Sequence, residues 1–155
     1  MTPSRLLLIG CALAAFAGCQ RREEPAPQPP APAAAPAPAL STEPLSFSEQ
    51  TPYASVRLTL PEAIRTQPEL HTALYASTVR ELRQFMEGAQ ADRTEAGSDS
   101  SLPPYEKTIT VEPGADAGTL FSLKRTDYDY SGGAHGNTLF AGVLWDKAAK
   151  RQIAA

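Results

Sequence analysis

Residues 69–88, ELHTALYASTVRELRQFMEG, carry apolar side chains at the spacing of one face of an α-helix, while the opposite face is polar. Before them, TQPE at 66–69 has the form of a capping box with Pro68 in the first turn. The sequence therefore predicts a long amphipathic helix that ends near Gly88 and lies on an apolar surface. Its apolar half consists of Leu70, Leu74, Tyr75, Val79, Leu82, Phe85 and Met86.

The segments on either side of this helix indicate strands. Upstream, Val56, Leu58 and Leu60 alternate with polar residues until Pro61. Downstream, a loop at 89–104 without apolar periodicity precedes three predicted strands: YEKTITVEPG at 105–114, TLFSLKRTDYDY at 119–130 and NTLFAGVLWDK at 137–147. The last is apolar on both parities, as expected of an interior strand. This order predicts an α+β fold with a mainly antiparallel sheet.

The strand predicted at 119–130 changes the parity of its apolar residues. Phe121 and Leu123 occupy odd positions, whereas Tyr128 and Tyr130 occupy even ones. Since neighbouring side chains of a strand point to opposite faces, the change predicts a bulge or a crossover of faces near residues 125–126.

The amino terminus has the pattern of an export signal. Arg5 precedes LLLIGCALAAFAG, an apolar run too short to cross a bilayer as a helix. The small residues before Cys19 resemble the lipobox of bacterial lipoproteins, which implies a signal peptide at 1–18 and a lipid anchor on Cys19. A rival box ends at Cys11, and an ordinary secretory signal is the alternative. With Gln20 next, the resemblance implies the outer membrane, facing the periplasm.

Residues 19–45 follow as the predicted lipidated cysteine and a linker containing PAPQPPAPAAAPAPA, whose composition is typical of a semi-rigid spacer. Residues 46–155 then form one small predicted domain. The formal net charge is −3 without a basic stripe, so we expect no nucleic-acid partner. No pair of cysteines is left for a disulfide or a thiolate zinc site in this domain.

The stretch 127–137, DYDYSGGAHGN, holds the candidate chemical groups. DYDYSG imitates the start of a calcium loop, but the twelfth position, which needs a Glu, is Thr138, so no metal is expected. Asp127 and Asp129 share one strand face at a spacing that glycosidase carboxylates also use, and a solvated edge is the simpler interpretation. The glycines predict a tight turn with positive backbone angles. We predict no enzyme and no cofactor; the alternative is an envelope hydrolase or deacetylase using Asp127, Asp129 and His135.

The same stretch resembles a known signature, Y-x-G-G-A-H-G-N, of the extracytoplasmic domain shared by PdaC-type deacetylases and RsiV-type anti-sigma factors. The resemblance covers roughly residues 52–155. In PdaC-type proteins a separate domain carries the deacetylase chemistry, and in RsiV-type proteins this region binds lysozyme. The resemblance thus implies a non-enzymatic recognition domain for a peptidoglycan-related or lysozyme-like partner. Relatives usually continue beyond the final turn, so we expect an incomplete domain: a fragment of a longer protein, which we favour, or a truncated domain with an uncovered edge. The matching residues are Tyr130, Gly132, Gly133, Ala134, His135, Gly136 and Asn137.

Overall fold

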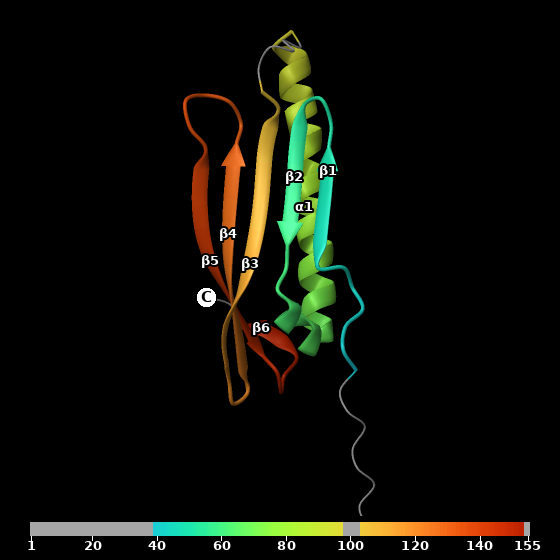
Figure 1. The fold of residues 1–155 in the computed structure, drawn as a ribbon, viewed down its shortest axis with the longest axis vertical. Helices are drawn as coiled ribbons and strands as arrows, with labels where there is room; N and C mark the ends of the chain where they lie inside the picture. Colours follow the sequence, from blue (N-terminus) through green and yellow to red (C-terminus); the bar gives the residue numbers. More distant parts are fainter. Residues whose placement is uncertain (1–38, 98–102, 154–155) are drawn as a thin grey trace, which may run out of the picture. The chain divides into compact units, whose positions relative to one another are not determined.

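A computed structural model describes residues 39–97 and 103–153 (Figure 1). Cys11, Cys19, the signal peptide and most of the Pro/Ala linker lie outside the described residues, so lipid anchoring stays a prediction. Within the two described ranges, no helix has the length and hydropathy needed to cross a membrane.

The described residues form one sheet and one long helix. The six strands follow each other in chain order across the sheet, and all neighbours are antiparallel except β2 and β3, which α1 connects. The fold is therefore α+β with a mainly antiparallel sheet, as predicted. The elements are β1 (Ser46–Gln50), β2 (Ala54–Thr59), the 3₁₀ helix η1 (Glu62–Thr66), α1 (Pro68–Glu95), β3 (Tyr105–Ala117), β4 (Leu120–Tyr130), β5 (Asn137–Asp146) and β6 (Arg151–Ile153).

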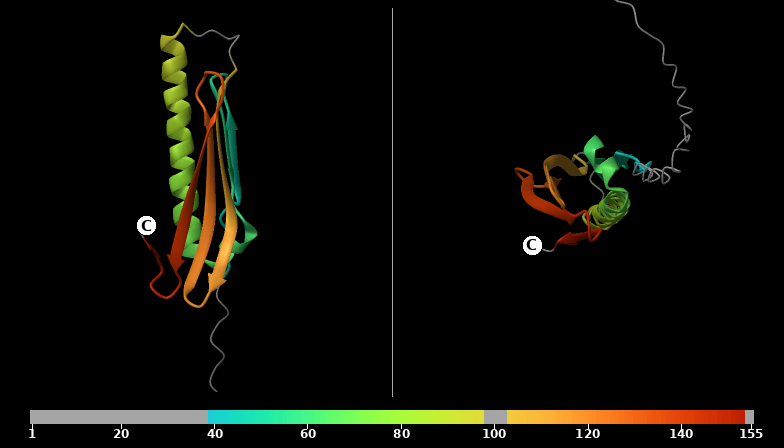
Figure 2. Two further views of the ribbon diagram at one scale, coloured as in Figure 1. Left: turned by 90° about the vertical axis from the view of Figure 1, so that its left-hand side faces the viewer. Right: turned by 90° about the horizontal axis from the view of Figure 1, so that it is seen from below.

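α1 lies along one face of the sheet, mainly over β2 and β3 (Figure 2). Its predicted apolar half is confirmed, because five of those side chains are buried and Tyr75 and Phe85 pack beside them. Beneath the helix, Leu58 and Ile109 are fully buried on paired positions of β2 and β3. This layer is the core of the domain. The buried helix residues of the predicted set are Leu70, Leu74, Val79, Leu82 and Met86.

The helix continues past Gly88 to Glu95, so the predicted end and the start of the predicted loop were wrong. Gly88 is exposed, and a single exposed glycine costs a helix only about 1 kcal/mol. The following turns bury Ala89 and Arg93. Arg93 donates a hydrogen bond of 2.9 Å from Nη1 to the carbonyl of Pro103 and lies over the Tyr105 ring. These contacts hold the extra turns against β3.

The start of the helix also differs from the predicted capping box. The residue before the first turn is Gln67, whose side chain makes no capping hydrogen bond. Thr66 ends η1 instead, and its hydroxyl donates to the carbonyl of Ala63 at 2.9 Å. Pro68 does occupy the first turn, as predicted. The short 3₁₀ helix therefore includes Thr66, the residue that the pattern assigned to the cap.

The predicted bulge near 125–126 is absent from the described strands, because β4 keeps a continuous register there with both neighbours. The irregularity lies in β3 between Pro113 and Asp116. There the Ala115 N–H donates to Ser122 Oγ at 2.7 Å, and a Cβ on Gly114 would lie 2.5 Å from that oxygen. The parity change has a simpler cause: odd positions of β4 face α1, whereas the tyrosines lie on the open face without the helix.

Among the described residues, β5 has a strand on both sides, as predicted for an interior strand, only where β6 pairs with it. β6 pairs only with Leu144–Asp146. Of the apolar side chains of β5, Val143 and Trp145 are buried, but Leu139 and Phe140 are 59% and 69% exposed. The apolar residues at odd and even positions of β5 therefore give this strand two apolar faces, of which only part is buried.

Candidate functional site

The turn between β4 and β5, Ser131–Gly136, lies at the end of the sheet opposite to the entry of the chain at β1 (Figure 1). Gly132 and Gly133 have φ values of 93° and 95°, which L side chains rarely adopt. The hydroxyl of Tyr130 donates to the carbonyl of Gly133 at 3.1 Å. One tyrosine and two glycines of the signature thus set the path of the main chain.

Gly136 has a different role, because its main chain contacts the ring of Tyr128. A Cβ on Gly136 would lie 2.6 Å from Cζ of that tyrosine, far inside van der Waals contact. Tyr128 therefore packs directly on the main chain of the turn. Sequence reasoning missed this contact, although the aromatic residue and the glycine lie in the same quoted stretch.

The tip of the turn presents His135 to solvent. Its Nδ1 lies 3.2 Å from the carbonyl oxygen of the adjacent Gly136, and Ala134 and Asn137 beside it are also exposed. These three signature residues differ from the tyrosines and glycines, which build the turn. They are the side chains that the turn leaves accessible to a partner.

Asp127 does not lie on a solvated edge, contrary to the prediction. It faces the helix side of the sheet, where Arg125 Nε donates to Oδ1 at 2.6 Å and Arg125 Nη2 to Oδ2 at 2.5 Å. Nη2 also reaches Glu81 of α1 at 2.7 Å. Hydrogen bonding to Asp127 raises the pKa of Arg125; burial opposes this effect, and the contact with Glu81 adds to it.

Lys107 extends this arrangement, because its Nζ lies 3.1 Å from Glu81 Oε1. We call Glu81, Lys107, Arg125 and Asp127 the ionic cluster. Its side chains are about one-fifth to two-fifths exposed and join α1 to β3 and β4. The bidentate contact with Arg125 occupies both oxygens of Asp127, so the cluster has the geometry of a structural clamp.

Of the three candidate catalytic residues, Asp127 and Asp129 share one face of β4, whereas His135 lies apart from them. Asp127 contacts Arg125 on the helix side, Asp129 is paired in register with Lys107 and Asn137, and His135 lies at the tip of the turn. Among residues 39–97 and 103–153, no group of three or more His, Cys, Asp or Glu side chains is arranged to hold a metal ion.

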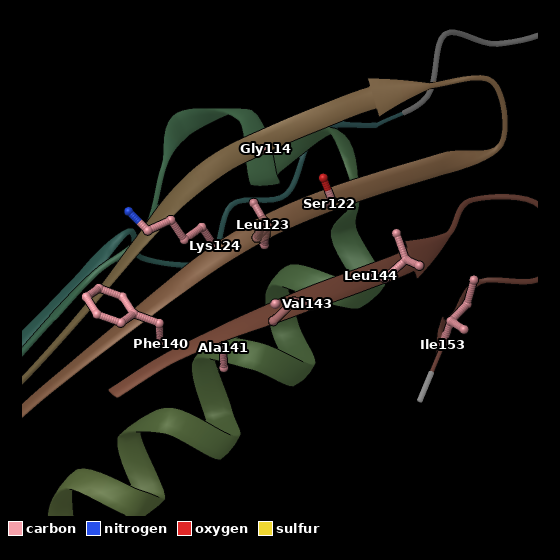
Figure 3. Close-up of a pocket in the computed structure, with 10 residues that line it drawn as sticks. Gly114, Ser122, Leu123, Lys124, Phe140, Ala141, Val143, Leu144 and Ile153 are labelled. Atoms are coloured by element: carbon pink, nitrogen blue, oxygen red, sulfur yellow. The ribbon is translucent and has the colours of Figure 1, made fainter. Parts of the chain in front are cut away.

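A second accessible feature is an apolar groove of about 630 Å³ on the open face, between β4 and β5. Phe140 and Lys124 lie at one end, and Leu144 and Ile153 at the other (Figure 3). The Lys124 ammonium lies 5.7 Å from the centre of the Phe140 ring. This groove was not predicted, because the sequence pattern favoured an interior position for β5; the apolar residues at both odd and even positions were the available signal.

Comparison with known proteins gives a family and two similar folds. The family model described as Deacetylase PdaC matches residues 47–138, from β1 to the start of β5. A DUF3298 family protein of Pseudomonas aeruginosa PAO1 is 18% identical, with a TM-score of 0.44 over 74% of this chain and 55% of that one. A DUF3298 family member of Bacteroides fragilis is 11% identical, with a TM-score of 0.43 over 70% of this chain and 56% of that one.

This chain thus spans little more than half the length of either solved structure, and no curated protein matches it. The family match is the informative one, since it covers more than half of the chain and reaches from β1 through α1 and β4 to the whole β4–β5 turn. By this match, the chain belongs to the PdaC family.

Proposed function

We propose that this chain is a non-enzymatic recognition domain of the cell envelope that binds a protein or peptidoglycan-related partner at the β4–β5 turn. The proposal rests on one observation: some residues of the turn fix its main chain, and others are exposed to a partner. Tyr128 and Tyr130 fix the main chain through Gly136 and Gly133. A fixed backbone lowers the entropy cost of binding for the side chains that it displays.

The side chains on display are those of Ala134, His135 and Asn137. A neutral imidazole offers one donor and one acceptor, and an amide offers both kinds of group. Sugar hydroxyls and peptide groups are partners that such side chains can recognise by hydrogen bonds. The turn therefore has the chemistry of a polar recognition site.

The arrangement of the candidate catalytic groups favours binding over hydrolysis. A hydrolase needs an acid and a base on the two sides of one scissile bond. Here Arg125 holds both oxygens of Asp127 on the helix side, and His135 lies at the tip of the turn. A clamp that links Glu81, Arg125 and Asp127 stabilises the fold around the turn.

Charge and position favour an envelope partner. The chain has a formal net charge of −3, which suits a cationic, lysozyme-like protein. The segment that leads from the Pro/Ala tract enters β1 at the end of the sheet opposite to the turn (Figure 1). A lipid anchor on Cys19 with a semi-rigid spacer would hold the domain off the outer membrane, in the periplasm.

Retention of lysozyme and of purified peptidoglycan sacculi by the immobilised full chain, in mild detergent at low salt, tests the proposal. We expect retention of one of the two, reduced about tenfold in the double variant His135→Ala/Asn137→Ala. Gln84→Ala, exposed on α1, is the matched control and should bind as the unaltered chain does. No retention of either ligand would contradict the proposal.

The same preparations distinguish the catalytic alternative. Incubation with peptidoglycan should release neither acetate nor soluble sugar fragments. If the chain released either product, and Asp129→Asn or His135→Ala abolished the release with folding intact, the hydrolase or deacetylase hypothesis would replace recognition.

A further inference from the structure

The end of α1, the start of β3 and the β4–β5 turn lie at the same end of the sheet (Figure 1). Arg93, in the last turns of α1, has its guanidinium 5.7 Å from the centre of the Tyr105 ring at the first position of β3. The same ring lies beside Gly132, where an added Cβ would be 3.7 Å from its Cε1. The Tyr105 ring therefore borders both the helix and the main chain of the turn.

Hydrogen bonds hold both Arg93 and Tyr105 in place. Arg93 is only 6% exposed, and its Nη1 donates to the carbonyl of Pro103 at 2.9 Å. The N–H of Tyr105 donates to the carbonyl of Tyr53, just before β2, at 2.8 Å. A buried guanidinium needs acceptors for its N–H groups and packs favourably on an aromatic face, so Arg93 restrains the ring from the helix side. The ring therefore has little freedom to move away from the turn.

The glycines of the turn are the part of the site that most needs such a restraint. Glycine has more backbone freedom than any other residue and loses more of it when the chain is ordered. Three glycines of the turn each lie against a different tyrosine, and one of these tyrosines comes from β3, outside the signature. The three pairs are Gly132 with Tyr105, Gly133 with Tyr130, and Gly136 with Tyr128.

We propose that Arg93 and Tyr105 are positioning residues of the β4–β5 turn, which keeps its binding conformation only while the last turns of α1 are docked on β3. This inference rests on the function proposed above, because it concerns the same turn. Tyr105 acts by restricting Gly132, and Arg93 acts through Tyr105. When the helix end is released, only a fraction of the molecules has a competent turn, and the apparent dissociation constant rises by the inverse of that fraction.

A second contact of the same kind on α1 separates this role from stabilisation of the whole domain. The guanidinium of Arg83 lies 5.5 Å from the centre of the Phe47 ring of β1. β1 is separated from β4 by two strands, β2 and β3, so this contact does not border the turn. Arg83→Met therefore removes a cation–aromatic contact between the helix and the sheet without touching the turn, and it is the matched control for Arg93→Met.

NMR relaxation of the labelled full chain in mild detergent measures the backbone order of residues 132–136. We expect order parameters of about 0.8 in the unaltered chain and below about 0.6 in Arg93→Met and Tyr105→Leu. Tyr105→Phe, which keeps the ring, and Arg83→Met should retain the order of the unaltered chain. Retention of lysozyme or sacculi should fall about threefold or more in Arg93→Met and Tyr105→Leu only.

Unchanged order of the turn in both Arg93→Met and Tyr105→Leu, with the domain folded by circular dichroism, would overturn the inference. An equal loss of order in Arg83→Met would do the same, because the turn would then respond to any weakening of the domain. Lower order with unchanged retention would remove the positioning role. If the unaltered chain retained neither ligand, the proposed function would fail, and the order parameters would separately decide whether Tyr105 holds the turn.

Discussion

β2 and β5 differ in how far the sheet protects their apolar side chains. In β2, Ala54, Val56 and Leu58 are at most 2% exposed, because α1 covers them. In β5, Leu139 and Phe140 remain mostly exposed, although their residue types are as apolar. The comparison shows that the position of the helix over the sheet, more than the composition of a strand, decides which strand belongs to the core.

The difference also separates two kinds of stabilisation. Under α1 the contacts are apolar and closely packed. Beyond it, the helix reaches β4 through the ionic cluster, in which Glu81 contacts Arg125 and Lys107. Packing volume stabilises the apolar core, which includes Phe121 and Leu123 of β4, whereas paired charges add to the contact between α1 and β4. Substitutions in the core and in the ionic cluster should therefore affect stability by different amounts and for different reasons.

The largest effect is expected from Leu82→Ala, since Leu82 is fully buried between α1 and the sheet. The cavity and the lost burial should lower the free energy of unfolding by about 2–5 kcal/mol. Leu139→Ala, the same change on the exposed strand, should cost about 0.5 kcal/mol or less. Urea denaturation followed by circular dichroism measures the free energy of unfolding of both variants. Equal losses for the two variants would contradict the distinction between the buried core and the exposed strand.

Arg125→Met should have the next largest effect. It leaves Asp127 and Glu81 without their shared partner in a partly buried site, at a cost of about 1.5–3 kcal/mol. The comparison variant is Lys124→Met, which removes an ion pair with Glu112 in which both side chains are more than half exposed. That pair should contribute less than about 1 kcal/mol. A larger loss for Lys124→Met in the same denaturation assay would show that the ionic cluster is not a clamp.

Gly136→Ala tests the turn. The added Cβ would collide with the Tyr128 ring, so we expect a loss of about 1–3 kcal/mol. Gly88→Ala should have the opposite sign, because its Cβ would meet open space and alanine favours the helix by about 1 kcal/mol. Thermal unfolding of the two variants decides the point: a neutral Gly136→Ala would mean that the tyrosine does not restrain the turn.

The smallest effect is expected at Glu69, an exposed residue whose pKa is lowered from 4.5, chiefly by a hydrogen bond from Lys150. Because the folded-state pKa is the lower one, this contact stabilises the fold above pH 4.5 and loses its effect as the pH falls through the folded-state value. Glu69→Gln should slightly reduce the melting temperature at pH 7 and leave it unchanged near pH 3. A reduction of the same size at both pH values would assign the effect to something other than the charge.

The sequence predicted the elements whose pattern depends on local periodicity. The apolar face of α1 and the alternation in β2 follow from the spacing of Leu70 to Met86 and of Val56 to Leu60, and both are as expected. Family membership followed from the signature at 130–137. These features depend only on residues that lie close together in the sequence, so a single sequence is enough to predict them.

Features that depend on distant contacts were missed. The helix passes Gly88 because Arg93 contacts Pro103 and Tyr105, which no periodicity reveals. Arg125 pairs with Asp127 on its own strand and with Glu81 on α1, and the exposure of Leu139 and Phe140 depends on which elements lie beside β5. In the candidate site, the sequence predicted the turn and its glycines but not the ring of Tyr128 over Gly136.

The mixed connectivity of the sheet has a consequence for the order of folding. β3, β4 and β5 are joined by short turns, so their hairpins close on the microsecond scale. The parallel pairing of β2 with β3 must bridge the whole of α1, and such non-local closure is slow. Until α1 docks, the hairpins expose the future core face. The time spent in that state, rather than the stability of the finished domain, sets how much of the chain is lost to aggregation.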